Sequence, residues 1–301
     1  MCNRYRGSYV VLDGPWSRLG ECHMIEKIYI PTVCRVDNQV TYNNLPKELQ
    51  EKVVFVVQEW ERDQYQYDAE YIVLPPEIKI GAKNALSRTR KIIYHIAKNE
   101  RYAMLDDDLH FKRRNSKYWN GVSNMEKSSR ICTEDDVREM FETYDKWLDN
   151  GVTFCGCAQR NNPPFGNVSE DNRSMSSCYW INGTDWADKI DEMRLDETRV
   201  AQDVLLIIGL LSRGFRNRVS NEFIFVNQSI ASKKETSIHW DQTEFDEVHE
   251  NHKLIESMYP KYFKILYDEN GDRVPGGFRG FGKASMKWSQ AYKDSQVDTL
   301  L

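Results

Sequence analysis

Short, continuously apolar segments separated by stretches of helix length are the feature that most limits how this chain can fold. Residues 27–33 (KIYIPTV), 53–58 (VVFVVQ) and 70–74 (EYIVL) are rich in β-branched residues and apolar on both faces. Such strands are typical of parallel sheets that helices cover on both sides. The sequence therefore predicts an α/β protein built on a mostly parallel mixed sheet.

Helical periodicity supplies the layers that would cover this sheet. Apolar residues recur three and four positions apart in residues 81–98, 133–148, 200–212 and 245–258. Thr133 is a good N-cap, because three acidic residues follow it in the first helical turn. Further strands are predicted at residues 102–105, 151–158, 178–181 and 221–227.

Composition excludes two classes of protein. The 301 residues have a net charge of −5, and 40% of them are hydrophobic, which is too apolar for a disordered chain. The longest apolar run, residues 204–211, is far shorter than the roughly 20 residues of a membrane-spanning helix. The first residues lack the apolar segment of a signal peptide, and the seven scattered Cys residues predict free thiols. We therefore expect a cytoplasmic protein that has no membrane partner.

Three adjacent carboxylates follow one predicted strand directly. Asp106, Asp107 and Asp108 come after the apolar residues 102–105 (YAML), at the kind of sheet edge where α/β folds bind ligands. Clustered negative charges repel one another, and a divalent cation such as Mn²⁺ or Mg²⁺ would neutralise them and bridge to nucleotide phosphates. In an extended segment, Asp106 and Asp108 would share one face and Asp107 would point away. A solvated acidic turn is the alternative.

The surroundings of this acidic segment resemble glycosyltransferases of the GT-A fold. In those enzymes a Gly- and Arg-containing helix precedes an apolar strand that ends in a D-x-D motif, and this chain has GAKNALSRTR in residues 81–90 before YAMLDDD. The chain departs from the commonest form, because no Asn follows either arginine. The acidic pair typical of such families is Gln202-Asp203 here, so only one carboxylate carries over.

The chain is more narrowly similar to the TET-associated glycosyltransferases of phages. It has the IPTVCR segment of that family in residues 30–35, the Arg-rich helix, and the LDDDLHF block in residues 105–111. The resemblance implies a GT-A-like, Rossmann-like catalytic domain over residues 1–240, with a C-terminal helix and a basic, aromatic tail in residues 241–301. It also implies transfer of a glucose- or arabinose-like sugar from a nucleotide-diphosphate sugar, such as a UDP-sugar. The acceptor would be the hydroxymethyl group of 5-hydroxymethylcytosine in phage DNA.

The same resemblance implies roles for particular residues. If the reaction inverts the anomeric centre, Asp203 would be the general base that deprotonates the acceptor hydroxyl, and if it retains, Asp203 would orient the acceptor. The alternative is an acid in the first turn of a helix that interacts with the helix dipole. The Mn²⁺ or Mg²⁺ ion would be bound by Asp106, Asp108 and His239. The residues that would contact the donor are Arg35, Glu59, Arg88, Arg90, Asp106 and Asp107.

Basic residues interleaved with aromatic ones indicate where DNA would bind. Residues 79–130 contain thirteen Lys and Arg against five Asp and Glu, so the acidic net charge hides a basic region. The predicted nucleic-acid-binding residues are Lys112, Arg113, Arg114, Lys117, Trp119, Arg279, Lys283 and Lys287. Two other classes stay open on sequence alone. One is a GT-A transferase with a protein, glycan or small-molecule acceptor, or a nucleotidyltransferase of similar fold, and the other is a non-catalytic DNA-binding module.

Overall fold

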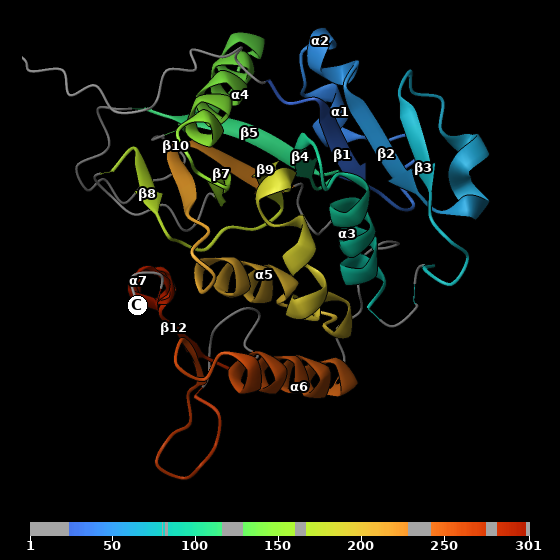
Figure 1. Ribbon diagram of the computed structural model, residues 1–301. Coiled ribbons are helices and arrows are strands. Elements are labelled where there is room, and N and C mark those ends of the chain that lie inside the picture. Colours follow the sequence, from blue (N-terminus) through green and yellow to red (C-terminus); the bar gives the residue numbers. More distant parts are fainter. Residues whose placement is uncertain are drawn as a thin grey trace, which may run out of the picture.

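One large mixed sheet organises the chain. The structure is a computed structural model, and it describes residues 24–79, 81, 84–115, 129–159, 167–227, 242–274 and 282–298. The strands of the sheet are β1 (Lys27–Pro31), β2 (Val53–Val57), β3 (Glu70–Val73), β4 (Arg101–Leu105), β5 (Leu109–Arg114), β6 (Ser129–Ile131), β7 (Phe154–Gln159), β8 (Ser169–Asp171), β9 (Cys178–Asn182) and β10 (Asn217–Asn227). Their order is β3-β2-β1-β4-β9-β7-β10-β5-β6, and β8 pairs with β10 (Figure 1).

Strand directions confirm the predicted α/β class with a mostly parallel mixed sheet. Strands β1 to β4 are parallel to one another, and β7 is parallel to β10. Strands β5, β8 and β9 run against their neighbours. Because β1 and β4 are parallel neighbours, the residues that follow both strands meet at one edge of the sheet.

Helices cover both faces of the sheet. On one side lie α1 (Val40–Asn43), α2 (Lys47–Gln50) and α4 (Glu134–Asp149), and on the other α3 (Ala85–Ile96), α5 (Gln202–Leu211) and α6 (Gln242–Met258) (Figure 1). Alternate strand residues enter the two cores: Val54 and Val56 pack on the α3 and α5 side, whereas Val53 and Phe55 pack on the α4 side. Strand β2 is therefore apolar on both faces because both of its faces are buried, whereas β3 lies at the sheet edge and Val73 is exposed.

Short 3-10 helices and a small second sheet complete the chain. The 3-10 helices are η1 (Glu59–Gln64), η3 (Gly183–Asp185), η4 (Ala187–Lys189), η5 (Asp191–Met193) and η6 (Leu195–Glu197). Strands β11 (Phe263–Ile265) and β12 (Ala284–Met286) pair with each other and precede α7 (Trp288–Asp298).

Predicted and observed helices agree best where a cap marks the boundary. The Thr133 hydroxyl accepts a hydrogen bond from the Asp136 N–H at 3.2 Å, which confirms the N-cap of α4. Helix α3 begins at Ala85, later than the predicted residue 81. Helix α7 was not predicted, because its apolar residues are few.

The C-terminal residues pack against the rest of the chain. Ile255 of α6 and Trp288 and Ala291 of α7 are buried in the same hydrophobic cluster as Leu205 and Leu206 of α5. The boundary at residue 240 stays a prediction. Within the described residues, no helix is both long and apolar enough to cross a membrane.

Candidate functional site

The three acidic residues lie in a tight turn between β4 and β5. The Asp106 N–H donates to the Ser177 carbonyl at 2.8 Å. Thr41 of α1 fixes the turn, since its hydroxyl donates to the Asp106 carbonyl at 2.5 Å and accepts from the Leu109 N–H at 2.8 Å. The expectation that Asp106 and Asp108 share one face is wrong, because the chain turns here and is not extended.

Arg35 lies between two of these carboxylates. Its guanidinium is 3.3 Å from Asp107 and 3.5 Å from Asp108. The Thr32 hydroxyl also donates to Asp107 at 2.7 Å, and the Asn227 amide donates to Asp108 at 2.8 Å. Burial raises the pKa of Asp107 to about 7, although Arg35 and Thr32 act in the opposite direction. One arginine thus offsets part of the charge of two buried acids.

Arg90 neutralises the third carboxylate. Its guanidinium is 2.6 Å from the Asp106 carboxylate and only 5% of the residue is exposed. Asp203, in the first turn of α5, belongs to the same electrostatic cluster: burial raises its pKa, Arg90 lowers it, and Asp106 raises it. The Arg90 Nε and the Tyr179 hydroxyl are buried in this cluster without a hydrogen-bond partner among the described residues.

One face of α3 joins the acidic turn to the segment before α5. The Asn84 amide donates to the Asp196 carbonyl at 2.9 Å, and the Ser87 hydroxyl donates to the Thr198 carbonyl. Asn84, Ser87 and Arg90 are three residues apart, so they lie on one stripe of the helix. Helix α3 therefore brings Asp106 and Asp203 together, although they are far apart in the sequence.

A pocket lies beside the acidic turn at the carboxyl ends of β1 and β2. It has a volume of about 220 Å³ and is lined by Val36, Asp37, Gln64, Gln66 and Tyr67. Val36 and Asp37 directly follow Arg35, so the loop that lines the pocket also contacts the acidic turn through Arg35. This is where α/β folds bind nucleotides.

Glu59 and Arg88, two of the residues predicted to contact the sugar donor, lie away from the acidic turn. Glu59 and Trp60 begin η1 and are exposed, Trp60 by 54%. Arg88 donates to the Glu77 carbonyl at 3.2 Å, whereas Arg90 reaches Asp106. Arg88 and Arg90 are two residues apart, so their side chains point to different faces of the helix. The sequence alone did not show which of these faces meets the acidic turn.

The chemistry of the acidic turn suits a hard cation, but its described geometry does not form a metal site. Carboxylate oxygens are the ligands that Mg²⁺ and Mn²⁺ prefer. The described residues include no group of three His, Cys, Asp or Glu side chains that could hold an ion, and Arg35 and Arg90 contact the carboxylates instead. His239 lies outside the described residues.

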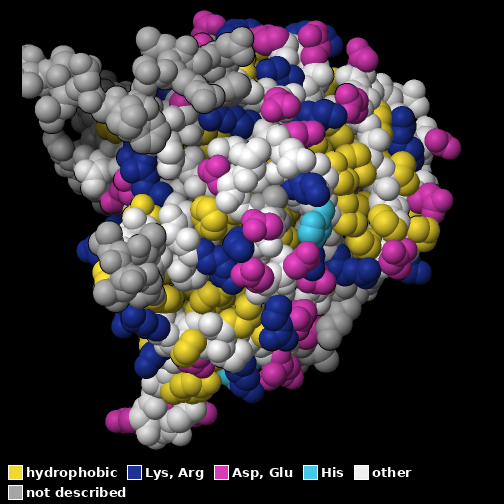
Figure 2. Space-filling model, in the orientation of Figure 1, with side chains coloured by type: hydrophobic (Ala, Val, Ile, Leu, Met, Phe, Trp, Pro, Cys, Tyr) yellow, Lys and Arg dark blue, Asp and Glu magenta, His cyan; other side chains and the backbone are white. Residues whose placement is uncertain are grey.

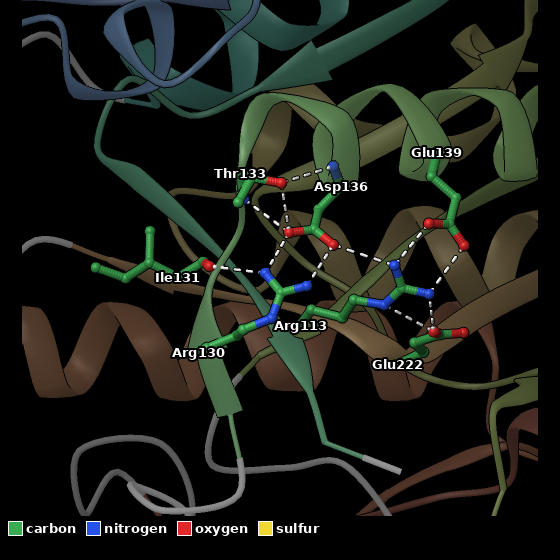
Figure 3. A network of polar contacts seen from close by, with 7 residues as sticks. All are labelled: Arg113, Arg130, Ile131, Thr133, Asp136, Glu139 and Glu222. Carbon is green, nitrogen blue, oxygen red and sulfur yellow. Dashed lines mark hydrogen bonds and ion pairs between the residues drawn. The ribbon is translucent and has the colours of Figure 1, made fainter.

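Two of the predicted DNA-binding arginines have internal partners. Arg113 of β5 contacts Glu139 and Glu222 at 2.6 Å each and Asp136 at 3.1 Å (Figure 3). Arg130 of β6 pairs with the same Asp136, so the network fastens the β5–β6 hairpin to α4 (Figure 3). Arg114 is buried, and its guanidinium donates to the Asn221 carbonyl at 3.4 Å.

The other predicted DNA-binding residues are distributed as follows. Lys112 is partly exposed on β5, and Lys283 and Lys287 are exposed next to β12. Lys117, Trp119 and Arg279 lie outside the described residues. On the face shown in Figure 2, basic side chains are interspersed with acidic ones and form no continuous strip.

Sequence reasoning missed the residues that hold the site together. Thr32, Thr41 and Asn227 bind the acidic residues, and Tyr94 and Tyr179 flank Arg90 and Asp203. Thr32 lies in the quoted IPTVCR segment, which was the only signal available. The others follow no motif, since their roles come from tertiary contacts.

Comparison with known proteins agrees with this geometry. No curated protein matches the chain. The family model of the TET-Associated Glycosyltransferases matches residues 26–236, which include β1 to β10, the acidic turn and Asp203. The mixed sheet with helices on both faces is consistent with a GT-A-like fold. Because the match covers more than two thirds of the chain, this protein belongs to the TET-associated glycosyltransferase family and is an enzyme that transfers a sugar.

Proposed function

We propose that the enzyme moves a glucose- or arabinose-like sugar from a nucleotide-diphosphate sugar to the hydroxymethyl group of 5-hydroxymethylcytosine in phage DNA. The observation that carries this proposal is a shared charge cluster in a chain of this family: Arg90 is 2.6 Å from Asp106, and its charge also lowers the pKa of Asp203. This cluster links a partly exposed acid on α5 to the acidic turn at the sheet edge. A base and a donor site must be neighbours for the sugar to pass between two substrates.

On the donor side, the nucleotide would occupy the pocket at the ends of β1 and β2. Gln64 and Gln66 supply amide donors and acceptors for a base, and Tyr67 supplies a ring. In this proposal the base of a UDP-sugar lies in the pocket of about 220 Å³, and the diphosphate extends toward Arg35 and the acidic turn.

On the acceptor side, Asp203 would take the proton of the hydroxymethyl group. Burial raises the pKa of Asp203, and Arg90 opposes this shift. A raised pKa makes a carboxylate a stronger base toward the acceptor hydroxyl. If the reaction retains the anomeric configuration, Asp203 would instead orient the acceptor.

Mn²⁺ or Mg²⁺ is part of this proposal, with Asp106, Asp108 and His239 as its ligands. Such an ion would stabilise the charge of the departing nucleotide diphosphate. The carboxylates now pair with Arg35 and Arg90, so metal dependence has to be measured directly.

DNA as the acceptor would be bound by Lys112, Lys283 and Lys287 together with Lys117, Trp119 and Arg279. Arg113 and Arg114 instead bind residues of β10 inside the protein, so we assign these two arginines to the stability of β5 and not to DNA binding. A protein, glycan or small-molecule acceptor is the competing proposal, and the mixed charges in Figure 2 favour neither class.

The deciding experiment measures nucleotide release from a panel of nucleotide sugars with Mn²⁺. Each donor is tested with DNA that contains 5-hydroxymethylcytosine and with the same DNA containing cytosine. We expect release only with the hydroxymethylated DNA, and loss of release in Asp203→Asn and in EDTA. If no donor reacts with hydroxymethylated DNA, the proposed acceptor is wrong.

A further inference from the structure

The turn that leads into α5 has a strained backbone. Ala201, two residues before Asp203, has a φ of +57°, which lies in the left-handed region that side-chain-bearing residues rarely adopt. Such a conformation persists only where the surrounding structure holds it, and it is often found at functional sites. The contacts that hold this turn therefore decide where the Asp203 carboxylate lies.

One side chain of α6 binds this turn through two backbone groups. The Asn251 Oδ1 accepts hydrogen bonds from the Arg199 N–H at 2.7 Å and the Val200 N–H at 3.0 Å. Only 9% of Asn251 is exposed. Glu247, one helical turn earlier, pairs with the Arg199 guanidinium at 2.6 Å.

The turn is thus held from two directions. Helix α3 binds its start through Asn84 and Ser87, and α6 binds the two residues directly before Ala201. Helix α6 lies beyond the residues that match the family model. The C-terminal part of the chain therefore contacts the site through a residue that the family match does not include.

We infer that Asn251 is a positioning residue for Asp203: it fixes the strained turn from which α5 starts and so sets the place of the carboxylate. The inference rests on the proposed function, in which Asp203 acts on the acceptor. A misplacement of about 1 Å can lower the rate of an enzyme about 100-fold.

The test compares Asn251→Leu, which has a similar volume and no acceptor, with Asn251→Asp, which keeps an acceptor oxygen. Glu250→Gln is the matched control, because Glu250 is exposed on the same helix and, among the residues that the structure describes, pairs with Lys253 alone. Steady-state kinetics give kcat and the KM for the donor. Backbone amide exchange of residues 198–206 reports whether the turn is held.

We expect Asn251→Leu to lower kcat at least 10-fold, to change the donor KM less than twofold and to speed exchange of the turn. Asn251→Asp and Glu250→Gln should stay within threefold of the wild-type kcat. The inference is overturned if Asn251→Leu keeps its kcat, or if Asn251→Asp is as slow as Asn251→Leu. Should Asn251→Leu not fold, Asn251→Ser replaces it with the same expected results, because the shorter side chain cannot reach both N–H groups.

Asp203→Asn, measured in parallel, separates this inference from the proposed function. If Asp203→Asn is inactive and Asn251→Leu is fully active, the role of Asp203 stands and only the positioning role fails. If Asp203→Asn keeps its turnover, the role of Asp203 fails, and the positioning role fails with it.

Discussion

Removing the charge of Arg90 should destabilise the fold and the site together. Arg90→Met keeps the apolar stem of the side chain and deletes the guanidinium, which contacts Asp106 and whose charge also acts on Asp203. Arg88→Met is the matched control. It makes the same change two residues earlier on α3, where the partly exposed guanidinium donates to the Glu77 carbonyl and contacts no carboxylate of the described residues.

The expected free-energy change follows from the burial of the pair. Breaking a buried ion pair costs roughly 3–5 kcal/mol. The Arg90 side chain is 6% exposed but that of Asp106 is 26% exposed, so water replaces part of the lost interaction. We therefore expect Arg90→Met to lower the free energy of unfolding by about 2–3 kcal/mol, and Arg88→Met by less than about 1 kcal/mol. At about 2 °C per kcal/mol, the Arg90→Met melting temperature falls by about 4–6 °C.

Urea unfolding of both variants at pH 8 measures this difference. A double-mutant cycle with Asp106→Asn then isolates the pair, for which we expect a coupling energy of about 2 kcal/mol. If Arg90→Met costs no more than Arg88→Met, or if the coupling is zero, the two acids are not held by Arg90 and the described site is wrong.

Three further predictions concern other charged residues. Burial raises the pKa of Asp145 to about 6, so the stability that exists below its ordinary pKa of 3.8 is lost as the pH rises through 6. The free energy of unfolding should fall by at most about 3 kcal/mol, and this fall should be absent in Asp145→Asn. If urea unfolding of the wild type and of Asp145→Asn depends on pH in the same way from pH 4 to 7.5, the prediction is contradicted. Arg113→Met should lower the melting temperature in differential scanning calorimetry, since Glu139 and Glu222 lose their cation and Asp136 keeps only Arg130 among the described residues, whereas Lys112→Met should not. Equal melting temperatures would refute the network in Figure 3. If Lys283 and Lys287 bind DNA, each Ala substitution should reduce the salt dependence of binding by about one ion in fluorescence anisotropy, and unchanged slopes would exclude that role.

The acidic turn shows how far the sequence led toward the site. The three carboxylates after an apolar strand were visible as a motif, and their place at the sheet edge followed from the parallel arrangement of β1 and β4. The directions in which these three side chains point could not be predicted from the sequence, because hydrogen bonds to Thr41 hold a turn where an extended segment was assumed. Arg113 illustrates the same limit: a basic residue in a basic segment predicts phosphate binding, but three carboxylates from α4 and β10 already surround it.

The sequence by itself determined the main strands and helices that build the two cores, because hydrophobic periodicity is a local property. It did not determine β5, β6, β8 or α7, which carry weaker patterns. It also determined the chemical types available, through the acidic run, the Arg-rich helix and Asp203. Only the tertiary structure decided which charges meet and which turn is strained. Arg113 finds Glu222 at a separation of 109 residues, and Asn251 binds the turn before Asp203 at a separation of 52, distances over which no local pattern carries information.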